Sequence, residues 1–335
     1  MEIAGRGERL ESFDGGEESL LGDKKKSSSN GEGGGPSPSA PILQEMNQMA
    51  ITAQPASVNQ LDSVLNDSHG LLIRERFYWS QVACAACERK TQFKVAKWDP
   101  SMPGILEDND FVSQPLVLEF YEESDCFCRY CLHSMRELKL GIFSGVRTQE
   151  SSMAWENPNN GWPPGRDPHV ILFRPFKCNI PLFCCLPCPG EISAIDGPSG
   201  ALRARVMQDW KCWNCCWPCD VYLGTFDATG VRTFTVHTPR ACGSGCINCC
   251  APSCCNRTHT SFIRRGNAIV GPSVGAIEVH WPGWNSRGLL QAYSAAENFA
   301  VIFPAQSTTN EKLQIVSAWS LSNFLYWEKR ANQRN

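Results

Sequence analysis

The longest mostly apolar run of the chain lies near its C-terminus, at residues 313–327, between Lys312 and Glu328. Fifteen residues of α-helix are about 22 Å long, whereas a membrane-spanning helix needs about 20 apolar residues. The run also contains Gln314 and several serines, which at about 100° per residue are spread around the whole helix. Because no face is clearly polar, we expect a buried helix whose hydroxyl and amide groups are hydrogen-bonded.

Twelve short runs rich in β-branched and aromatic residues precede this helix. Several alternate apolar and polar residues, as at 202–206 and 232–236, and turn sequences such as DGPSG and DATG separate them. The runs lie at 71–79, 91–98, 115–121, 137–143, 169–176, 190–196, 201–208, 220–226, 231–237, 258–263, 274–281 and 298–304. Period-2 strands in this number favour an antiparallel barrel or sandwich. Together with the apolar helix, they predict a mainly β domain: a closed barrel of roughly twelve strands around the C-terminal helix.

The first 65 residues have a different composition, rich in Gly, Ser, Pro and Glu, as in GEGGGPSPSAP at 31–41. Such a segment cannot bury enough apolar surface to offset chain entropy, so we predict a disordered tail at 1–65 and a domain at 70–330. Pro38 and Pro41 have the spacing of a polyproline II ligand, which favours either a site for protein partners or a plain linker. We expect no secretory signal, because the N-terminus has no apolar core.

Nineteen cysteines are the most unusual feature of the composition, and seventeen of them lie between Cys126 and Cys255. Without secretion, disulfides are the less expected use, which leaves metal binding, lipidation or packing. Several cysteines form CxxC pairs, the spacing of structural zinc ligands. The predicted zinc ligands are Cys84, Cys87, Cys128, Cys131, Cys212 and Cys215. Glu2 stands where N-myristoylation requires glycine.

The charge distribution and the motifs exclude several function classes. The net charge is −3, but residues 201–335 hold thirteen basic and seven acidic residues, which suits an anionic membrane surface or a scattered solvated face. The chain has no Gly-rich phosphate loop, no serine nucleophile elbow and no HExxH. We therefore expect a translocator or binding protein and not an enzyme.

Two segments are more specific than this general pattern. Residues 174–211 combine an Arg-Pro strand end, a cysteine cluster, an alternating strand and Gln208-Asp209-Trp210. Residues 280–304, HWPGWNSRGLLQAYSAAENFAVIFP, place a Trp-containing turn and Asn298-Phe299 before the apolar helix. Together with the cysteine blocks, these segments resemble the phospholipid scramblase family over about residues 70–330. The resemblance implies a tubby-like fold, with twelve strands around a central C-terminal helix.

The resemblance also implies a function: ATP-independent, calcium-stimulated movement of phospholipids between membrane leaflets. Members of that family lie on the cytoplasmic face of membranes, notably the plasma membrane, and palmitoylation of a cysteine cluster helps to hold them there. The matching positions are Cys184, Cys185 and Cys188. Two acyl chains make a stable anchor where one does not.

The calcium segment of the family is only partly matched. Glu297 and Asn298 are its oxygen donors here, whereas Ala295, Gln306 and Thr308 fill the other acidic positions. Calcium takes six to eight oxygen ligands, so we expect weak binding or none at this segment.

A second reading of the same domain is a tubby-like module that binds lipid headgroups, DNA or protein partners and transports nothing. The position of the C-terminal helix separates the two readings. A helix that spans the bilayer leaves the barrel to be filled by other groups, whereas a helix that fills the barrel leaves no evident lipid path. The oligomeric state is not specified by any of these features.

Overall fold

The computed structural model describes residues 60–76, 91–123, 137–145, 162–163, 166–176, 189–209, 220–239, 257–283 and 298–327. The chain separates into two units, Met1–Ile42 and Leu43–Asn335, and every described residue belongs to the second. All nineteen cysteines lie outside the described residues.

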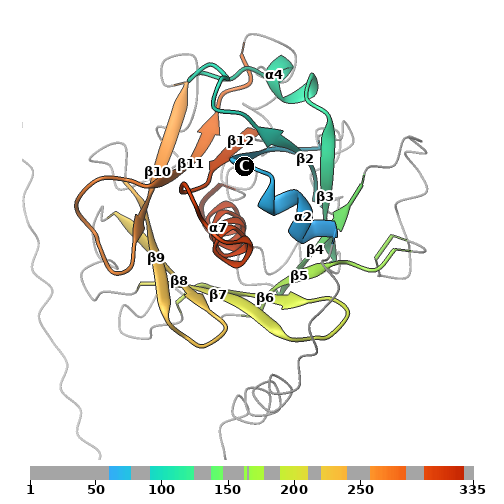
Figure 1. Ribbon diagram of the computed structural model, residues 1–335, viewed down its shortest axis with the longest axis vertical. Helices are drawn as coiled ribbons and strands as arrows, with labels where there is room; N and C mark the ends of the chain where they lie inside the picture. Colours follow the sequence, from blue (N-terminus) through green and yellow to red (C-terminus); the bar gives the residue numbers. More distant parts are fainter. Residues whose placement is uncertain are drawn as a thin grey trace, which may run out of the picture. The chain divides into compact units, whose positions relative to one another are not determined.

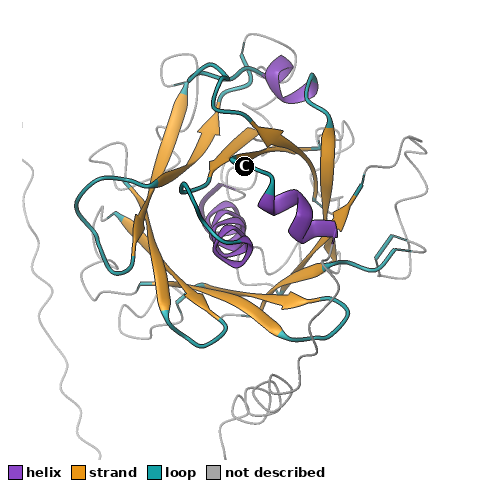
Figure 2. Ribbon diagram, viewed as in Figure 1, coloured by secondary structure: helices purple, strands orange, loops and turns teal. Residues whose placement is uncertain are grey.

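The second unit contains a closed barrel of twelve antiparallel strands (Figures 1 and 2). Each strand pairs with its neighbours in sequence, and β1 closes the ring by pairing with β12. The strands are β1 (Gly70–Glu75), β2 (Gln92–Trp98), β3 (Leu116–Glu123), β4 (Leu138–Ser144), β5 (Val170–Arg174), β6 (Glu191–Asp196), β7 (Leu202–Gln208), β8 (Val221–Asp227), β9 (Arg232–Thr238), β10 (Thr258–Arg265), β11 (Gly275–His280) and β12 (Asn298–Ile302). The predicted fold class is confirmed, since each strand falls within or close to one of the twelve predicted runs.

The antiparallel order gives the barrel two distinct ends. All odd-numbered strands finish at one end, which we call the cleft end and which holds Glu75, Glu123 and Arg174. The opposite end, which we call the α2 end, holds the first residue of β1 and helix α2 (Gln60–Asn66). Helix α7 (Thr309–Ser322) starts at the α2 end, and its last turns reach the cleft end.

Helix α7 lies inside the ring of strands, as predicted (Figure 1). It is continued by a π-helical turn, η4 (Asn323–Trp327), and begins four residues before the predicted start at 313. Its first turn is polar, and Thr308 forms a capping box in which its hydroxyl accepts from the Glu311 N–H at 3.2 Å. All residues from Lys312 to Ser322 are buried.

Among the helices in the described ranges, none combines the length and the apolarity needed to cross a bilayer.

The polar groups of α7 are mostly hydrogen-bonded, as its burial requires. Gln314 Oε1 accepts hydrogen bonds from the Thr225 hydroxyl, at 3.1 Å, and from the Thr233 hydroxyl. The Ser317 hydroxyl donates to the Leu313 carbonyl at 2.8 Å. The helix is therefore fixed to β8 and β9 by an amide as well as by apolar packing.

Helix α2 lies before residue 70, where the domain was predicted to begin. It lies partly within the segment 1–65 that the sequence predicts as a disordered tail, but Leu61 and Leu65 are buried in the barrel core. The two leucines are four residues apart, so they share one face of a short helix. A helix of seven residues with two core leucines is too short to be recognised in the sequence after a long Gly- and Ser-rich segment.

Lys312 connects the two internal helices. Its Nζ donates to the carbonyls of Leu65, Asn66 and Ser68 at 2.8, 3.0 and 2.9 Å, at the C-terminal end of α2. Burial lowers the pKa of Lys312 from its ordinary value of 10.5, with the nearby Asp67 carboxylate acting in the opposite direction. The residue that bounds the apolar run in the sequence is thus a buried cap for a second helix.

A third helix, α4 (Asp108–Val112), lies outside the ring (Figure 1). Phe111 and Leu106 pack there on the outer side chains Leu72 and Ala300. The connection between β2 and β3 therefore covers the outer face of β1 and β12. No helix was predicted there, because five residues carry no detectable period.

Candidate functional site

Charged side chains continue the inward-facing rows of the strands at the cleft end. Leu71 and Ile73 of β1 belong to the barrel core, and period-2 alternation puts Glu75 in phase with them. In β3, Glu122 follows Leu118 and Phe120 in the same way, and only 1% of Glu122 is exposed. Arg174 follows Val170 and Leu172 in β5 and is equally buried. The interior of the barrel thus changes from apolar to charged at this end.

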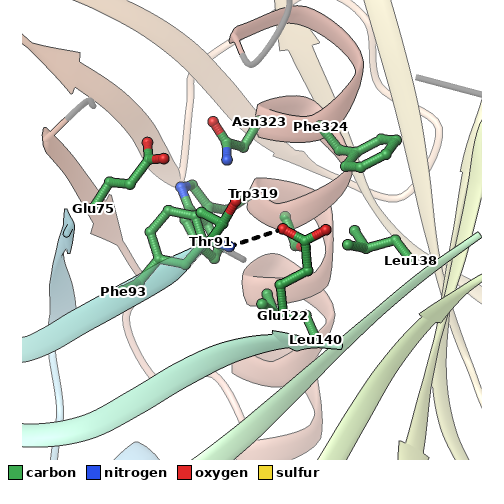
Figure 3. A pocket seen from close by; sticks show the side chains of 10 residues that line it. Glu75, Thr91, Phe93, Glu122, Leu138, Leu140, Trp319, Asn323 and Phe324 are labelled. Atoms are coloured by element: carbon green, nitrogen blue, oxygen red, sulfur yellow. Dashed lines mark hydrogen bonds between the residues drawn. The ribbon is translucent and has the colours of Figure 1, made fainter. Parts of the chain in front are cut away.

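These strand ends and the end of α7 enclose a cleft (Figure 3). Its cavity volume is about 20 Å³, which is room for about one water molecule. Its lining residues are Glu75, Thr91, Phe93, Glu122, Leu138, Leu140, Trp319, Ser320, Asn323 and Phe324. Glu122 Oε2 accepts the main-chain N–H of Thr91 at 3.1 Å, which fixes one carboxylate oxygen. Figure 3 shows Glu75, Glu122, Asn323 and Trp319 among the side chains that line the cleft.

Trp319 forms the floor of this cleft and is fully buried. Its ring packs edge-on against Phe93, with ring centroids 5.0 Å apart, and against Phe299 at 5.5 Å. Among the described residues, its indole N–H has no hydrogen-bond partner, and the same is true of the buried Ser322 hydroxyl. A buried donor without an acceptor costs about 1–3 kcal/mol, so the indole N–H is available to a ligand or an ordered water.

The last turn of α7 and the start of η4 both reach the cleft. Ser320 and Asn323 line it, and the Asn323 N–H donates to the Ser320 carbonyl where the helix continues into η4. The Glu75 and Glu122 carboxylates line the same cleft. Arg174 lies at the same end of the barrel, with its guanidinium 4.5 Å from the centroid of the Phe324 ring.

The predicted lipidation and zinc cysteines all lie outside the described residues, but the strand ends beside them are described. Cys84 and Cys87 fall between β1 and β2, and Cys128 and Cys131 between β3 and β4. The palmitoylation candidates Cys184, Cys185 and Cys188 fall between β5 and β6, and Cys212 and Cys215 fall between β7 and β8. Each of these connections joins strands at the cleft end. Within the described part of the chain, no group of three or more His, Cys, Asp or Glu residues is arranged to hold a metal ion.

Of the two predicted calcium residues, Asn298 is among the described residues and Glu297 is not. Asn298 is fully buried at the start of β12, and its Nδ2 donates to Asp108 Oδ1 at 3.2 Å. Arg74 holds the same carboxylate with two hydrogen bonds, at 2.8 and 3.0 Å. Asn298 therefore fastens α4 to the barrel. Its Oδ1 is buried and has no hydrogen-bond partner among the described residues.

Sequence reasoning did not identify the acidic cleft. The sequence does contain a signal for it. Glu75 and Glu122 each continue the every-second-residue pattern of the inward-facing apolar side chains, whereas a charged residue at the end of a strand ordinarily points to solvent. Reading that pattern as inward requires the strand register, which only the closed ring supplies.

Comparisons with known proteins give curated relatives for this chain. It is 24% identical to human phospholipid scramblase 1 over 217 residues, which cover 63% of this chain and 53% of that protein. It is 25% identical to the rat protein of the same name over 212 residues, covering 63% and 50%. Human phospholipid scramblase 2 is 26% identical over 160 residues, covering 48% and 46%.

The chain thus spans about half the length of the curated relatives it matches. No family model matches the chain, and no solved structure matches it significantly. The similarities confirm the predicted resemblance to the phospholipid scramblase family.

Proposed function

We propose that this relative of the phospholipid scramblases acts on membrane phospholipids and promotes their ATP-independent movement between leaflets. The observation that carries the proposal is the similarity to phospholipid scramblases 1 and 2 over half to two-thirds of the chain. A second observation supports the proposal: the cysteine-containing connections all leave the barrel at the same end. Several lipidated cysteines there would attach that end of the domain to a bilayer.

The anchoring that we propose is palmitoylation of Cys184, Cys185 and Cys188, on the cytoplasmic face of the plasma membrane. Replacement of all three cysteines by alanine is expected to move the protein from the membrane fraction to the soluble fraction. An unchanged membrane fraction would remove this part of the proposal. Metal analysis of the purified protein tests the alternative use of the cysteines as ligands for structural zinc.

Calcium stimulation is a separate part of the proposal. Glu297 and the unpartnered Oδ1 of Asn298 would supply two oxygens, fewer than the six to eight that calcium takes. We therefore expect a weak calcium response, visible only at high calcium concentration.

A second candidate function is a module that binds lipid headgroups, protein partners or DNA without transport. It is favoured by the filled interior of the barrel, since α7 occupies the centre and Trp319 is completely buried there. Moving a headgroup through hydrocarbon needs a polar path, which a filled barrel does not offer through its own centre. In the transport reading, lipids would therefore have to move around the domain and not through it.

Reconstitution separates the two candidates. The full chain is placed in liposomes that contain a fluorescent phospholipid, and loss of outer-leaflet fluorescence after addition of a membrane-impermeant reductant is followed with and without calcium. Transport predicts that more than half of the fluorescence is lost in vesicles that contain protein. Loss limited to the outer-leaflet half, by protein that melts cooperatively and co-sediments with the vesicles, would contradict transport and leave the binding module.

A further inference from the structure

We propose that segment 43–53 of this chain docks as a short amphipathic helix on an exposed aliphatic surface at the α2 end of the barrel. That surface, which we call the aliphatic patch, is formed by Val231 in the β8–β9 turn and by Ile269, Val270 and Val274 in the β10–β11 loop. The contact lies within one chain, so it goes beyond the proposed function and does not depend on lipid movement.

The aliphatic patch consists of side chains that the barrel leaves largely in water. Val270 is 81% exposed and Val231 is 59% exposed. The four residues of the patch are among only seven large apolar side chains that are exposed in the described part of the chain. Single exposed apolar side chains are common, whereas a group of them in one place indicates an interaction surface.

The two turns that carry the patch are neighbours. Strand β9 begins directly after the first turn, β10 ends directly before the second, and the two strands pair with each other (Figure 1). Beyond the last residue of β10, the Gly266 N–H donates to the Thr233 carbonyl at 2.6 Å. The start of the β10–β11 loop is therefore fixed two residues from Val231, which precedes β9.

Segment 43–53 lies outside the described residues, and its helical form is predicted from the sequence. At about 100° per residue, five of its apolar residues fall within an arc of about 120°. They are Leu43, Met46, Met49, Ala50 and Ala53. Pro41 lies just before the segment, where proline suits a first helical turn, and Pro55 follows where a helix would end. Ile51 is the one apolar residue of the segment outside the arc.

A helix of this length is marginal in water by itself, so its apolar face needs a partner. Its polar face carries Glu45 and no lysine or arginine, whereas helices that lie on anionic bilayers are rich in basic residues there. The aliphatic patch offers the complementary charge. Arg264 and Arg265 stand at the base of the β10–β11 loop, no residue from 266 to 274 is charged, and the Arg265 side chain is 53% exposed. Charge and apolarity together favour the patch over a bilayer.

The segment is also tethered within reach of the patch. Six residues separate it from the start of α2, which is about 20 Å of extended chain. Arg203 donates to Asp62 of α2 at 2.7 Å and to Asn310 of α7 at 2.8 Å. The next residue of α7, Glu311, pairs with Arg265 at 3.1 Å. A short tether corresponds to a millimolar effective concentration, so even a weak contact is populated.

Photo-cross-linking of the full chain tests which surface covers the patch. Val270 is replaced by p-benzoylphenylalanine, and illumination is expected to give cross-links to residues 43–53 of the same molecule at a yield that does not change on dilution. Phe176, which is 51% exposed at the cleft end, is replaced in the control, which should give no cross-link to the segment. A yield that falls on dilution would show contact with a second copy, and cross-links to lipid in phosphatidylserine-containing vesicles in place of the segment would show contact with a bilayer. Either result would overturn the inference.

Hydrogen exchange of point variants in solution tests the helical face. Met46→Glu places a charge in the docked face and is expected to speed amide exchange at 228–231 and 267–274 about tenfold. Ile51→Glu is the matched control, because position 51 lies outside the apolar arc, and it should leave exchange at both turns unchanged. Both substitutions lie outside the barrel, and circular-dichroism melting checks that the barrel is intact. Unchanged exchange with Met46→Glu, or equally faster exchange with Ile51→Glu, would rule out docking through this face.

Discussion

Lys312 holds the two internal helices together through three hydrogen bonds to main-chain carbonyls at the end of α2. Lys312→Met keeps the aliphatic length of the side chain and removes the ammonium. Three buried or partly buried acceptors then lose their donor, at a cost of about 1–3 kcal/mol, partly offset because no cation remains to be buried. We expect the free energy of unfolding to fall by about 2 kcal/mol and the melting temperature by about 4–8 °C.

Thermal melting followed by circular dichroism measures the change, and Lys139→Met is the control. Lys139 is half-exposed, with an ion pair to Glu137 at 3.3 Å, so its loss should change the free energy of unfolding by less than about 0.5 kcal/mol. Equal melting temperatures for the two variants would show that the Lys312 hydrogen bonds contribute nothing to stability.

The sequence predicts which polar residues of the helix are buried, but it does not predict their hydrogen-bond partners. Gln314 and Ser317 were expected to be buried and satisfied, and both are. The partners of Gln314 on β8 and β9 could not be predicted, because they lie more than eighty residues away in the chain and meet the helix only when the ring closes. The acidic residues of the cleft depend on the same closure.

At the scale of elements, the strands were predictable because each one carries its own period-2 pattern. The start of α7 was not, since its polar first turn, Thr309 to Lys312, lies outside the apolar run and is recognisable only from the capping box at Thr308. Helices α2 and α4 are seven and five residues long, too short for a 3.6-residue period to be visible.

Helix α7 is also the element on which the barrel depends. Its buried residues fill the space that the apolar inner faces of the strands enclose. A chain ending at Ser307 would leave those faces in contact with water, and no other described element could replace the lost packing. We expect this truncated chain to show no cooperative melting transition.

A chain ending at Trp327 is the control, because it keeps α7 and η4 and loses only residues 328–335. It should melt within a few degrees of the full chain. A cooperative, native-like transition in the chain ending at Ser307 would contradict the role of α7 as the core, and would favour a helix that acts outside the barrel.

At the scale of the whole barrel, the two ends differ in what closes them. The α2 end is closed by a helix that Lys312 caps, whereas the cleft end is charged and is the end from which the cysteine-containing connections leave. Among the described residues, six of the seven exposed large apolar side chains lie in connections that join strands at the α2 end, namely β2–β3, β8–β9 and β10–β11, and Phe176 lies at the cleft end. Most connections at the cleft end are outside the described residues, so this comparison covers the α2 end more fully than the cleft end. The proposed lipidation favours the cleft end.

Hydrogen exchange on vesicles tests this orientation. Membrane contact at the cleft end should slow amide exchange at the ends of β1, β3 and β5 and leave the turns at 197–201 and 228–231 unchanged. The experiment uses protein produced in cells that can add the proposed acyl chains, and the variant with alanine at Cys184, Cys185 and Cys188 should show no change at either end. Slower exchange confined to 228–231 and the loop that contains Val270 would reverse the orientation, because those segments lie at the α2 end. Acyl chains on the cysteine-containing connections would then not face the bilayer, so this outcome would count against the proposed anchoring.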